Sequence, residues 1–135
     1  MAEENVERLS RVFELFTEPD LDWESLSEFV DPEVVWEVRS DFPDAGVYTG
    51  YDGLRRLSDS FDDVVEQTWY RPLEFIQTEN HVVVPLRWGG RGKGSHTPFA
   101  EREETWVLTL RDGRISRVRE YATKQDALEA VGLGE

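Results

Sequence analysis

The spacing of apolar residues changes once along this chain, and that change limits the folds it can adopt. In the first half, apolar residues recur every three or four positions, which is the period of one helix face. The first stripe ends at Pro19 and consists of Val6, Leu9, Phe13 and Phe16. From about residue 67, apolar and polar residues alternate as in a half-buried strand. Helices followed by strands predict an α+β domain, with N-terminal helices covering one face of a cone-shaped, curved antiparallel sheet.

Two more helices are predicted before the run of strands. Asp22 is suited to cap a short helix that Pro32 brings to an end, because the residue before a proline leaves the α region. A strand is predicted over 34–38, where apolar and charged residues alternate. Thr49 is suited to cap a longer third helix, so the segment 40–48 is expected to be irregular.

The second half of the chain predicts a series of strands joined by short turns. The strands are expected at about 67–78, 81–88, 99–110 and 114–122. Pro72 cannot donate to a ladder, so the first of them is expected to be bulged or at a sheet edge. Glu79-Asn80 and Asp112-Gly113 form the tight turns, and Thr123 caps a short C-terminal helix.

Length and charge exclude several classes of protein. The 135 residues suit one domain, so 1–135 is expected to fold as a single unit. The net charge of −14 would repel nucleic acid and anionic membrane, and neither is an expected partner. With no cysteine, disulfides and thiolate metal sites are excluded. No signal-like segment or apolar run of membrane length is present, and we expect a cytoplasmic protein.

A glycine-rich stretch, RWGGRGKGSHTP at 87–98, raises the question of phosphate binding. A phosphate loop requires G-x-x-x-x-G-K-[ST] in front of a helix. Here Gly94 follows Gly92-Lys93, and the next segment has the alternation of a strand. We therefore interpret the stretch as a flexible connection between two strands and predict no cofactor.

Three segments carry a resemblance to a known family: DPEVVWEVRS at 31–40, GVYTGYDGLRRL at 46–57 and TLRDGRISRVREYATKQDALEAVGL at 109–133. In amino-acid sequence and in order along the chain, they resemble the SnoaL-like branch of the nuclear transport factor 2-like superfamily. Its members are small α+β cones, commonly homodimers through the outer face of the sheet. The superfamily includes ketosteroid isomerase, polyketide cyclases, epoxide hydrolases and many members without an assigned reaction, so the resemblance implies a fold more than a reaction. His96 stands where close relatives tend to have glycine.

Glu120 is the candidate catalytic residue. In the isomerase-like and cyclase-like relatives, an acidic residue inside the cone moves a proton. Alternation in the last strand groups Glu120 with Val118 and Ala122, whose apolar side chains predict an inward face. Burial there would raise the pKa of the Glu120 carboxyl toward that of a general base. The alternative is a glutamate paired with a neighbouring arginine on a sheet face.

Aromatic residues are the candidate walls of a small-molecule pocket. Turning Trp36 inward buries more apolar area than the opposite register, which leaves Glu37 at the rim or surface. The same rule groups Trp106 with Glu104, a third acidic candidate. The predicted binding residues are Trp36, Trp106, Tyr48 and Trp88.

Two hypotheses for function follow from these residues. The first is a cofactor-independent isomerase, cyclase or hydrolase that acts on a small hydrophobic molecule, with Glu120 as base. The second is a non-catalytic module that binds a small ligand or dimerises, and an interior packed solid is a third possibility. His81 and His96 are far apart and predict no metal site. Ser95 beside His96 on a flexible loop lacks the fixed geometry of a nucleophile with its base.

Overall fold

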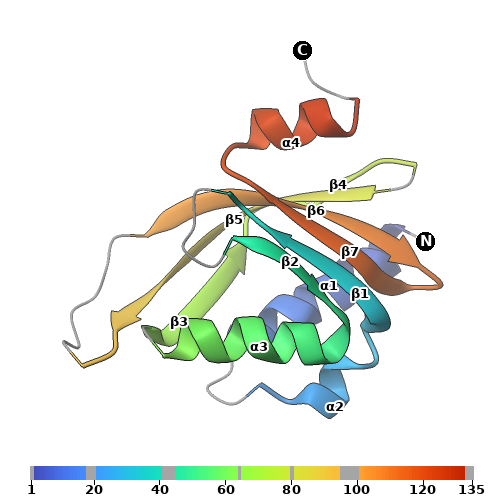
Figure 1. Ribbon diagram of the computed structural model, residues 1–135. Coiled ribbons are helices and arrows are strands. Elements are labelled where there is room, and N and C mark those ends of the chain that lie inside the picture. The colour runs from blue at the N-terminus through green and yellow to red at the C-terminus, as the bar shows by residue number, and fades with distance from the viewer. Residues whose placement is uncertain are drawn as a thin grey trace.

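The computed structural model describes residues 2–17, 21–40, 45–63, 65–79, 81–94 and 101–132. Their helices, labelled in Figure 1, are α1 (Ala2–Thr17), α2 (Trp23–Leu26), α3 (Gly50–Asp62) and α4 (Lys124–Ala130). Their strands are β1 (Val30–Val38), β2 (Gly46–Thr49), β3 (Val65–Pro72), β4 (Ile76–Gln77), β5 (His81–Gly92), β6 (Arg102–Arg111) and β7 (Arg114–Tyr121).

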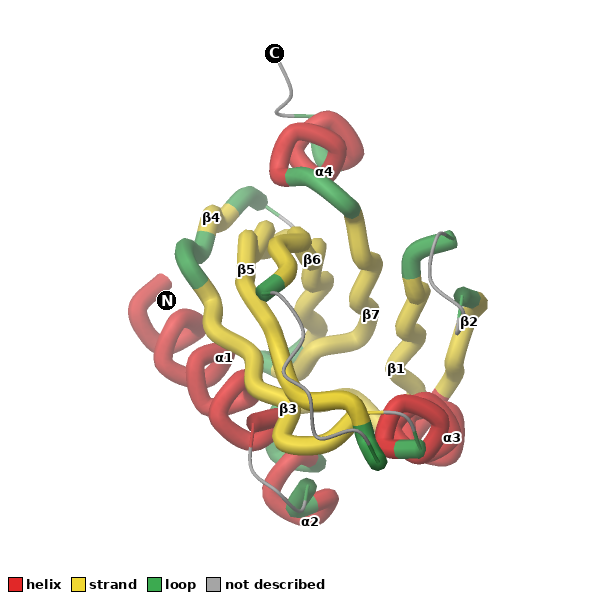
Figure 2. The backbone as a smooth tube through the Cα atoms, turned by 90° about the vertical axis from the view of Figure 1, so that its left-hand side faces the viewer, coloured by secondary structure: helices red, strands yellow, loops and turns green. Residues whose placement is uncertain are grey.

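The strands form one curled sheet in the order β2-β1-β7-β6-β5-β3, with β4 also paired to β5. Figure 2 shows the strands curving around a common interior, with α1 and α3 on two sides of it. The predicted α+β cone is confirmed, but the sheet is mixed because β1 and β7 run parallel. The alternation of apolar and polar side chains indicates that a segment is a strand. It does not indicate whether that strand runs parallel or antiparallel to its neighbour. A long connection between two strands permits parallel pairing.

The first helix covers the interior with the predicted stripe. Leu9 and Phe13 are at most 3% exposed, and Val12 and Leu15 beside them are buried as well. Helix α1 packs against β3, and α3 packs against β1 and β2. The short helix α4 lies on the other face of the sheet, where Ala127 joins Val83 and Val107 in a small second apolar cluster. No helix in the described ranges is both long and apolar enough to cross a bilayer.

Predicted helix caps are present at two of the helix starts. Asp22 accepts a hydrogen bond from the Ser25 backbone N–H at 3.2 Å, and Thr123 accepts one from the Asp126 N–H at 3.1 Å. The second helix is shorter than predicted, because it ends at Leu26 and strand β1 already begins at Val30. Proline near the start of a strand is tolerated where its missing N–H breaks no ladder bond.

Two predicted irregular segments are strands in the structure. Residues 46–49 form β2, which pairs with β1 in antiparallel register, whereas the sequence predicted an irregular segment over 40–48. Residues 89–92 extend β5, so the first half of the glycine-rich stretch belongs to the sheet. Gly89 has a steric reason to be glycine, because a Cβ atom there would lie 2.9 Å from the Trp69 ring. Residues 95–98 of that stretch lie outside the described ranges.

The broken strand predicted around Pro72 is confirmed. Strand β3 ends at Pro72, β4 follows after a gap, and both pair with β5 at one edge of the sheet. A register shift between Glu66 and Trp69 surrounds Gln67, whose φ is 53°. Such a bulge bends the edge strand and increases its twist.

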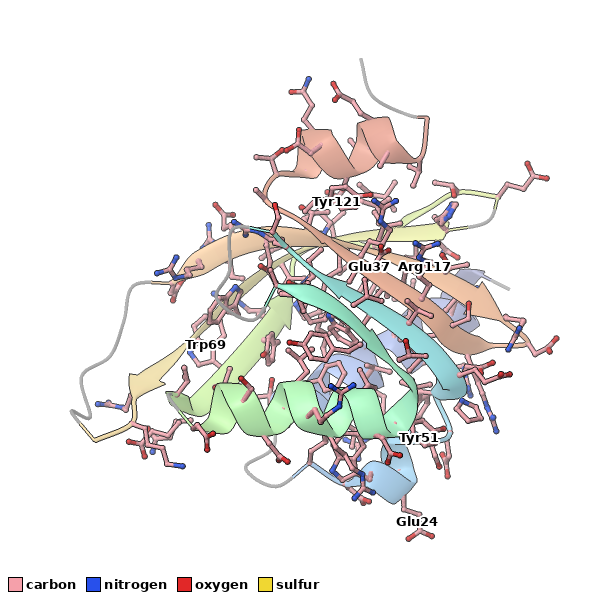
Figure 3. All side chains as sticks on the ribbon, in the orientation of Figure 1. Glu24, Glu37, Tyr51, Trp69, Arg117 and Tyr121 are labelled. Atoms are coloured by element: carbon pink, nitrogen blue, oxygen red, sulfur yellow. The ribbon has the colours of Figure 1, made fainter. Side chains whose placement is uncertain are left out.

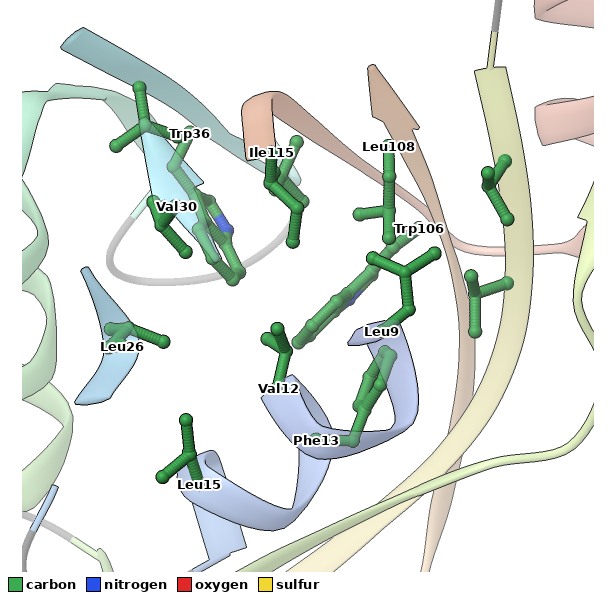
Figure 4. Packing of buried hydrophobic residues seen from close by; sticks show 14 of the residues in the cluster. Leu9, Val12, Phe13, Leu15, Leu26, Val30, Trp36, Trp106, Leu108 and Ile115 are labelled. Carbon is green, nitrogen blue, oxygen red and sulfur yellow. The ribbon is translucent and has the colours of Figure 1, made fainter. Parts of the chain in front are cut away.

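An aromatic cluster fills the space between α1 and the sheet. The Trp106 ring stacks on Phe13 at 5.3 Å between centroids and meets Trp36 edge to face at 5.1 Å. Phe16 contacts both tryptophan rings, and Tyr70 from β3 contacts Trp106 at 5.7 Å. Figure 4 shows Trp36 and Trp106 above the α1 side chains. Edge-to-face and offset-stacked rings of this kind stabilise a core beyond their buried area.

Candidate active site

Three neighbouring strands bring a polar group into this aromatic interior. On β6, side-chain alternation turns Glu104, Trp106 and Leu108 inward, and Trp106 stands directly opposite Glu120 of β7. On β1, Trp36 is the register partner of Val118, which is fully buried. The two carboxyl groups and the two indole rings therefore share the inner face of the sheet, as the alternation of residue types predicts.

Glu120 accepts a hydrogen bond from an indole. Trp36 Nε1 donates to Glu120 Oε2 at 2.7 Å. Burial, followed by repulsion from the nearby Glu104 carboxyl, raises the pKa of the Glu120 carboxyl to about 8. The Trp36 hydrogen bond and the backbone and charge of Arg39 act against this rise without reversing it. At neutral pH Glu120 therefore carries a proton in an interior that contains few polar groups.

Glu104 is 4% exposed and contacts a donor through each of its oxygens. Trp106 Nε1 donates to Oε1 at 2.6 Å, and Arg39 Nη1 donates to Oε2 at 3.3 Å. The pKa of the Glu104 carboxyl is raised overall, because the effect of burial exceeds the lowering by Trp106, Arg39 and Trp88. Glu104 thus has a charged partner that directly stabilises its ionised form.

Arg39 is the site residue that sequence reasoning missed. Its side chain is 14% exposed and reaches inward to Glu104 from the end of β1. Strict alternation with Trp36 and Val38 would place residue 39 on the outer face. Strand β1 stops at Val38, so alternation no longer applies beyond it. The sequence did offer one indication of an inward cation, because two acidic side chains on the inner face require a nearby positive charge or a proton.

The predicted binding residues lie in two places, the three tryptophans in the apolar core and Tyr48 on the edge strand β2. Trp36, Trp88 and Trp106 are at most 7% exposed, and all three belong to the main apolar cluster. Tyr48 lies on β2 opposite Trp36 and is half-buried, with the Arg56 guanidinium 5.8 Å from the centre of its ring. The tryptophans line the carboxylate pair, and Tyr48 lies beside this group at the edge of the sheet.

Glu37 lies on the outer face, as the chosen register predicts. Its Oε2 accepts from Arg117 Nη2 at 2.7 Å and pairs with Arg119 Nε at 3.1 Å. Figure 3 shows Glu37 and Arg117 side by side on that face. Neighbouring residues of the same strands therefore form an ion-pair group outside the sheet and a carboxylate pair inside it.

A cavity of about 690 Å³ lies next to this site and includes Glu104 in its lining. The other lining residues come from β5, β6 and the connections on either side of them: Leu73, Glu74, Pro85, Leu86, Glu103, Thr105, Ala122, Thr123 and Lys124. Lys124 pairs with Glu74 at 2.9 Å between two of these connections. None of the four predicted aromatic residues lines this cavity. Ala122, predicted to face inward, is exposed because β7 ends at Tyr121.

Metal binding and nucleophilic catalysis receive no support from the described residues. Within those ranges, no group of three histidine, aspartate or glutamate side chains could hold a metal ion. His81 begins β5 and is half-buried. Ser95 and His96 lie outside the described residues.

The fold and the interior site define a cone-shaped α+β protein with acidic groups in an aromatic core. Residues 9–118 match the SnoaL-like domain family. The chain therefore belongs to that family, and the resemblance found in the sequence is confirmed. No curated protein sequence matches the chain.

Solved structures support the same fold. A nuclear transport factor 2-like protein of unknown function from Burkholderia pseudomallei has a TM-score of 0.75 at 16% identity, covering 95% of this chain and 97% of that one. TerC, co-crystallised with polyporic acid, has a TM-score of 0.75 at 22% identity, covering 93% and 95%. A ketosteroid isomerase-like protein from Catenulispora acidiphila, in complex with trimethylamine, has a TM-score of 0.67 at 17% identity, covering 90% and 92%. At these identities the likeness is one of fold.

Proposed function

We propose that this chain binds a small, largely hydrophobic molecule at the interior site and moves a proton on it, as a cofactor-independent isomerase or cyclase. One observation carries the proposal: the carboxyl groups of Glu104 and Glu120 lie together among indole rings, where burial and repulsion from Glu104 raise the pKa of Glu120 to about 8. Carboxyl groups whose pKa values are raised by burial are characteristic of acid–base sites, although structural ion pairs also shift pKa values.

Glu120 is the proton-transfer group in this proposal. With a pKa of about 8, it is an acid below that pH and a base above it. When the acid form reacts, the O–H bond of Glu120 breaks, the proton moves to an oxygen or carbon of the ligand, and the electron pair stays on the carboxylate. Return of a proton from a second position of the ligand restores the acid. The cycle consumes no cofactor and leaves an isomerised or cyclised product.

The adjacent cavity supports the binding part of the proposal. Its volume of about 690 Å³ is in the range of small-molecule sites. Its lining combines apolar side chains such as Leu73 and Leu86 with Glu104 and with the charged residues Glu74, Glu103 and Lys124. TerC and the Catenulispora acidiphila protein share the fold, and each was crystallised with a small molecule. Fold likeness alone does not select the ligand, so these molecules serve here as probes.

A non-catalytic module that binds a small ligand or dimerises is the second candidate. It is favoured by the close packing of the rings, since Trp36 and Trp106 are 5.1 Å apart and Phe13 stacks on Trp106. In this case the carboxyl groups fix the orientation of the indoles and perform no chemistry.

Titration with polyporic acid tests the binding proposal. Quenching of tryptophan fluorescence reports binding, because three tryptophans surround the carboxylate pair. Glu120→Gln and the outer-face control Glu37→Gln are compared with the native chain. Binding that Glu120→Gln weakens and Glu37→Gln leaves unchanged supports the interior site. Equal affinities in all three proteins would exclude Glu120 from it.

Turnover assays separate the two candidates. Ketosteroid, epoxide and polyketide-type substrates are tested across a pH series with the native chain and Glu120→Gln. A rate that Glu120→Gln abolishes, and whose pH profile changes near pH 8, supports the enzyme. Binding without turnover, unchanged by Glu120→Gln, leaves the non-catalytic module.

We also propose a homodimer, with the outer face of the sheet as the contact. Val47 on that face is 60% exposed, so it is an apolar side chain that a contact between two copies could cover. Sedimentation of the native chain and Val47→Glu measures the oligomeric state. A monomer in both would reject the proposal. A cytoplasmic location stays a prediction of the sequence.

A further inference from the structure

The interior of the cone holds two carboxyl groups and, among the described residues that contact them, one cation. We propose that Arg39 decides which carboxyl group of the pair keeps its proton: its guanidinium holds Glu104 ionised and leaves Glu120 as the protonated, proton-donating member. Arg39 is in this view a positioning residue, since it acts on the reacting group through Glu104. The role in catalysis rests on the proposed function, whereas the location of the proton can be measured without any ligand.

Hydrogen-bond geometry favours the ionised form of Glu104. Its Oε1 accepts from Trp106 Nε1 at 2.6 Å, and its Oε2 accepts from Arg39 Nη1 at 3.3 Å. A carboxylate only accepts hydrogen bonds, so both contacts suit the charged group. A proton on either oxygen would face an N–H donor and displace one of these bonds. The contact with Arg39 is also charge-assisted, in a place where both side chains are largely shielded from water.

Glu120 has weaker reasons to ionise. Its carboxyl group accepts from the neutral indole of Trp36 at 2.7 Å and from the backbone N–H of Arg39, whereas the Arg39 guanidinium pairs with Glu104. Ionised Glu104 on the adjacent strand repels a second negative charge. Two buried carboxylates beside one cation would leave an uncompensated charge, which costs more than retaining a proton.

The surroundings of the pair supply few other charges. Glu104 comes from β6, Glu120 from β7 and Arg39 from the end of β1. Helix α1 contributes Phe13 and Phe16 to the same cluster, β5 contributes Trp88, and β3 contributes the phenol of Tyr70. Within the described residues, the charge balance of the pair therefore depends on Arg39.

Carbon-13 NMR of labelled glutamate side chains locates the proton in the native chain. Glu104→Gln and Glu120→Gln assign the two interior carboxyl signals, and the exposed Glu37→Gln is the matched control. We expect a high titration that is lost in Glu120→Gln and kept in Glu37→Gln. The proposal would be overturned if the high titration belonged to Glu104. In that case Glu104→Gln would lose it, and Glu120 in the native chain would titrate like an exposed glutamate.

Arg39→Gln tests the role of the guanidinium. Removal of an opposite charge at this distance raises the pKa of its partner by about one to three units, so the titration of Glu104 should move up by that amount. A neutral Glu104 repels Glu120 less, which offsets the loss of the Arg39 charge that also lowers the pKa of Glu120, so the titration of Glu120 should move less than that of Glu104. A gap between the two titrations that does not narrow overturns the proposal.

Arg39→Lys keeps the test decisive if Arg39→Gln does not fold, as judged by near-ultraviolet circular dichroism. Lysine retains the charge but lacks the planar fork of arginine, so the gap between the two titrations should narrow and keep its order. An unchanged gap would overturn the proposal. If the two carboxyl groups titrate in the expected order but no substrate is turned over, only the proposed function is rejected. If a substrate is turned over but the proton is on Glu104, only the role of Arg39 is rejected.

Discussion

The two faces of the sheet use the same residue types in opposite proportions. On the inner face, two glutamates, Glu104 and Glu120, share the vicinity of one arginine, Arg39. On the outer face, one glutamate, Glu37, contacts two arginines, Arg117 and Arg119. Outside the sheet, water screens the excess positive charge, and such pairs contribute little to stability. Inside it, the excess negative charge is relieved by a proton. Position in the fold, and not residue type, places one group in water-exposed ion pairs and the other among indole rings.

Removal of a ring from the inner face is expected to have the largest effect. Trp106→Ala removes a side chain that is 3% exposed and stacks on Phe13, and it also takes a donor from Glu104. We expect the free energy of unfolding to fall by about 3–5 kcal/mol, measured by urea denaturation. Val47→Ala, at a position that is 60% exposed in the single chain, should change it by less than about 0.5 kcal/mol at protein concentrations where the chain is monomeric. Equal losses in the two variants would contradict the difference between the faces.

The pH dependence of stability is expected to distinguish Glu120 from the outer glutamate. The folded chain keeps the Glu120 proton up to about pH 8, whereas the unfolded chain releases it at the ordinary pKa of glutamate. Stability from this group is therefore complete below the unfolded pKa and is lost as the pH rises toward 8.

Denaturation of native and Glu120→Gln chains at a series of pH values measures this loss. Between about pH 5.5 and 8 we expect the native chain to lose on the order of 3 kcal/mol more than Glu120→Gln. Glu37→Gln serves as the control and should follow the native curve. Parallel curves for native and Glu120→Gln chains would show that Glu120 titrates at its ordinary pKa.

A steric change on the outer face is expected to have an intermediate effect. A Cβ atom at Gly89 would lie 2.9 Å from Trp69 Cζ2, too close for the ring to stay in place. We expect Gly89→Ala to lower the free energy of unfolding by about 1–3 kcal/mol, measured by urea denaturation. The double variant with Trp69→Ala should show a smaller additional loss. A strictly additive double variant would mean that the ring is not the obstacle.

Removal of the outer ion pairs is expected to have the smallest effect. Glu37→Gln breaks contacts with two arginines that are about half exposed. We expect a loss of about 0–1 kcal/mol, reduced further by salt, in thermal or urea denaturation. A loss of several kcal/mol that persists in high salt would mean that Glu37 contributes as much to stability as the residues of the inner face.

Much of the fold follows from local patterns in the sequence. The α1 stripe, the caps at Asp22 and Thr123, and the break at Pro72 occur where predicted, because each depends on residues a few positions apart. Local patterns did not predict strand β2 or the extension of β5 through the glycines. Gly89 belongs in a strand because the Trp69 ring on the neighbouring strand occupies the space of its side chain.

The candidate site divides in the same way. Alternation places Glu104, Trp106 and Glu120 on one face from sequence alone, and comparison of buried areas turns Trp36 toward them. Arg39 follows the last residue of β1, where alternation gives no direction, and its contact with Glu104 joins residues far apart in the chain.

The sequence by itself determined the family, the order of the helices and of every strand except β2, and the inward direction of the acidic and aromatic side chains. These are properties of period and composition, and they depend on neighbours within a few positions. The tertiary structure decided the parallel pairing of β1 with β7, the contact of Arg39 with Glu104 and the repulsion of Glu120 by Glu104. These depend on distances between charges and rings on separate strands, which local patterns do not specify.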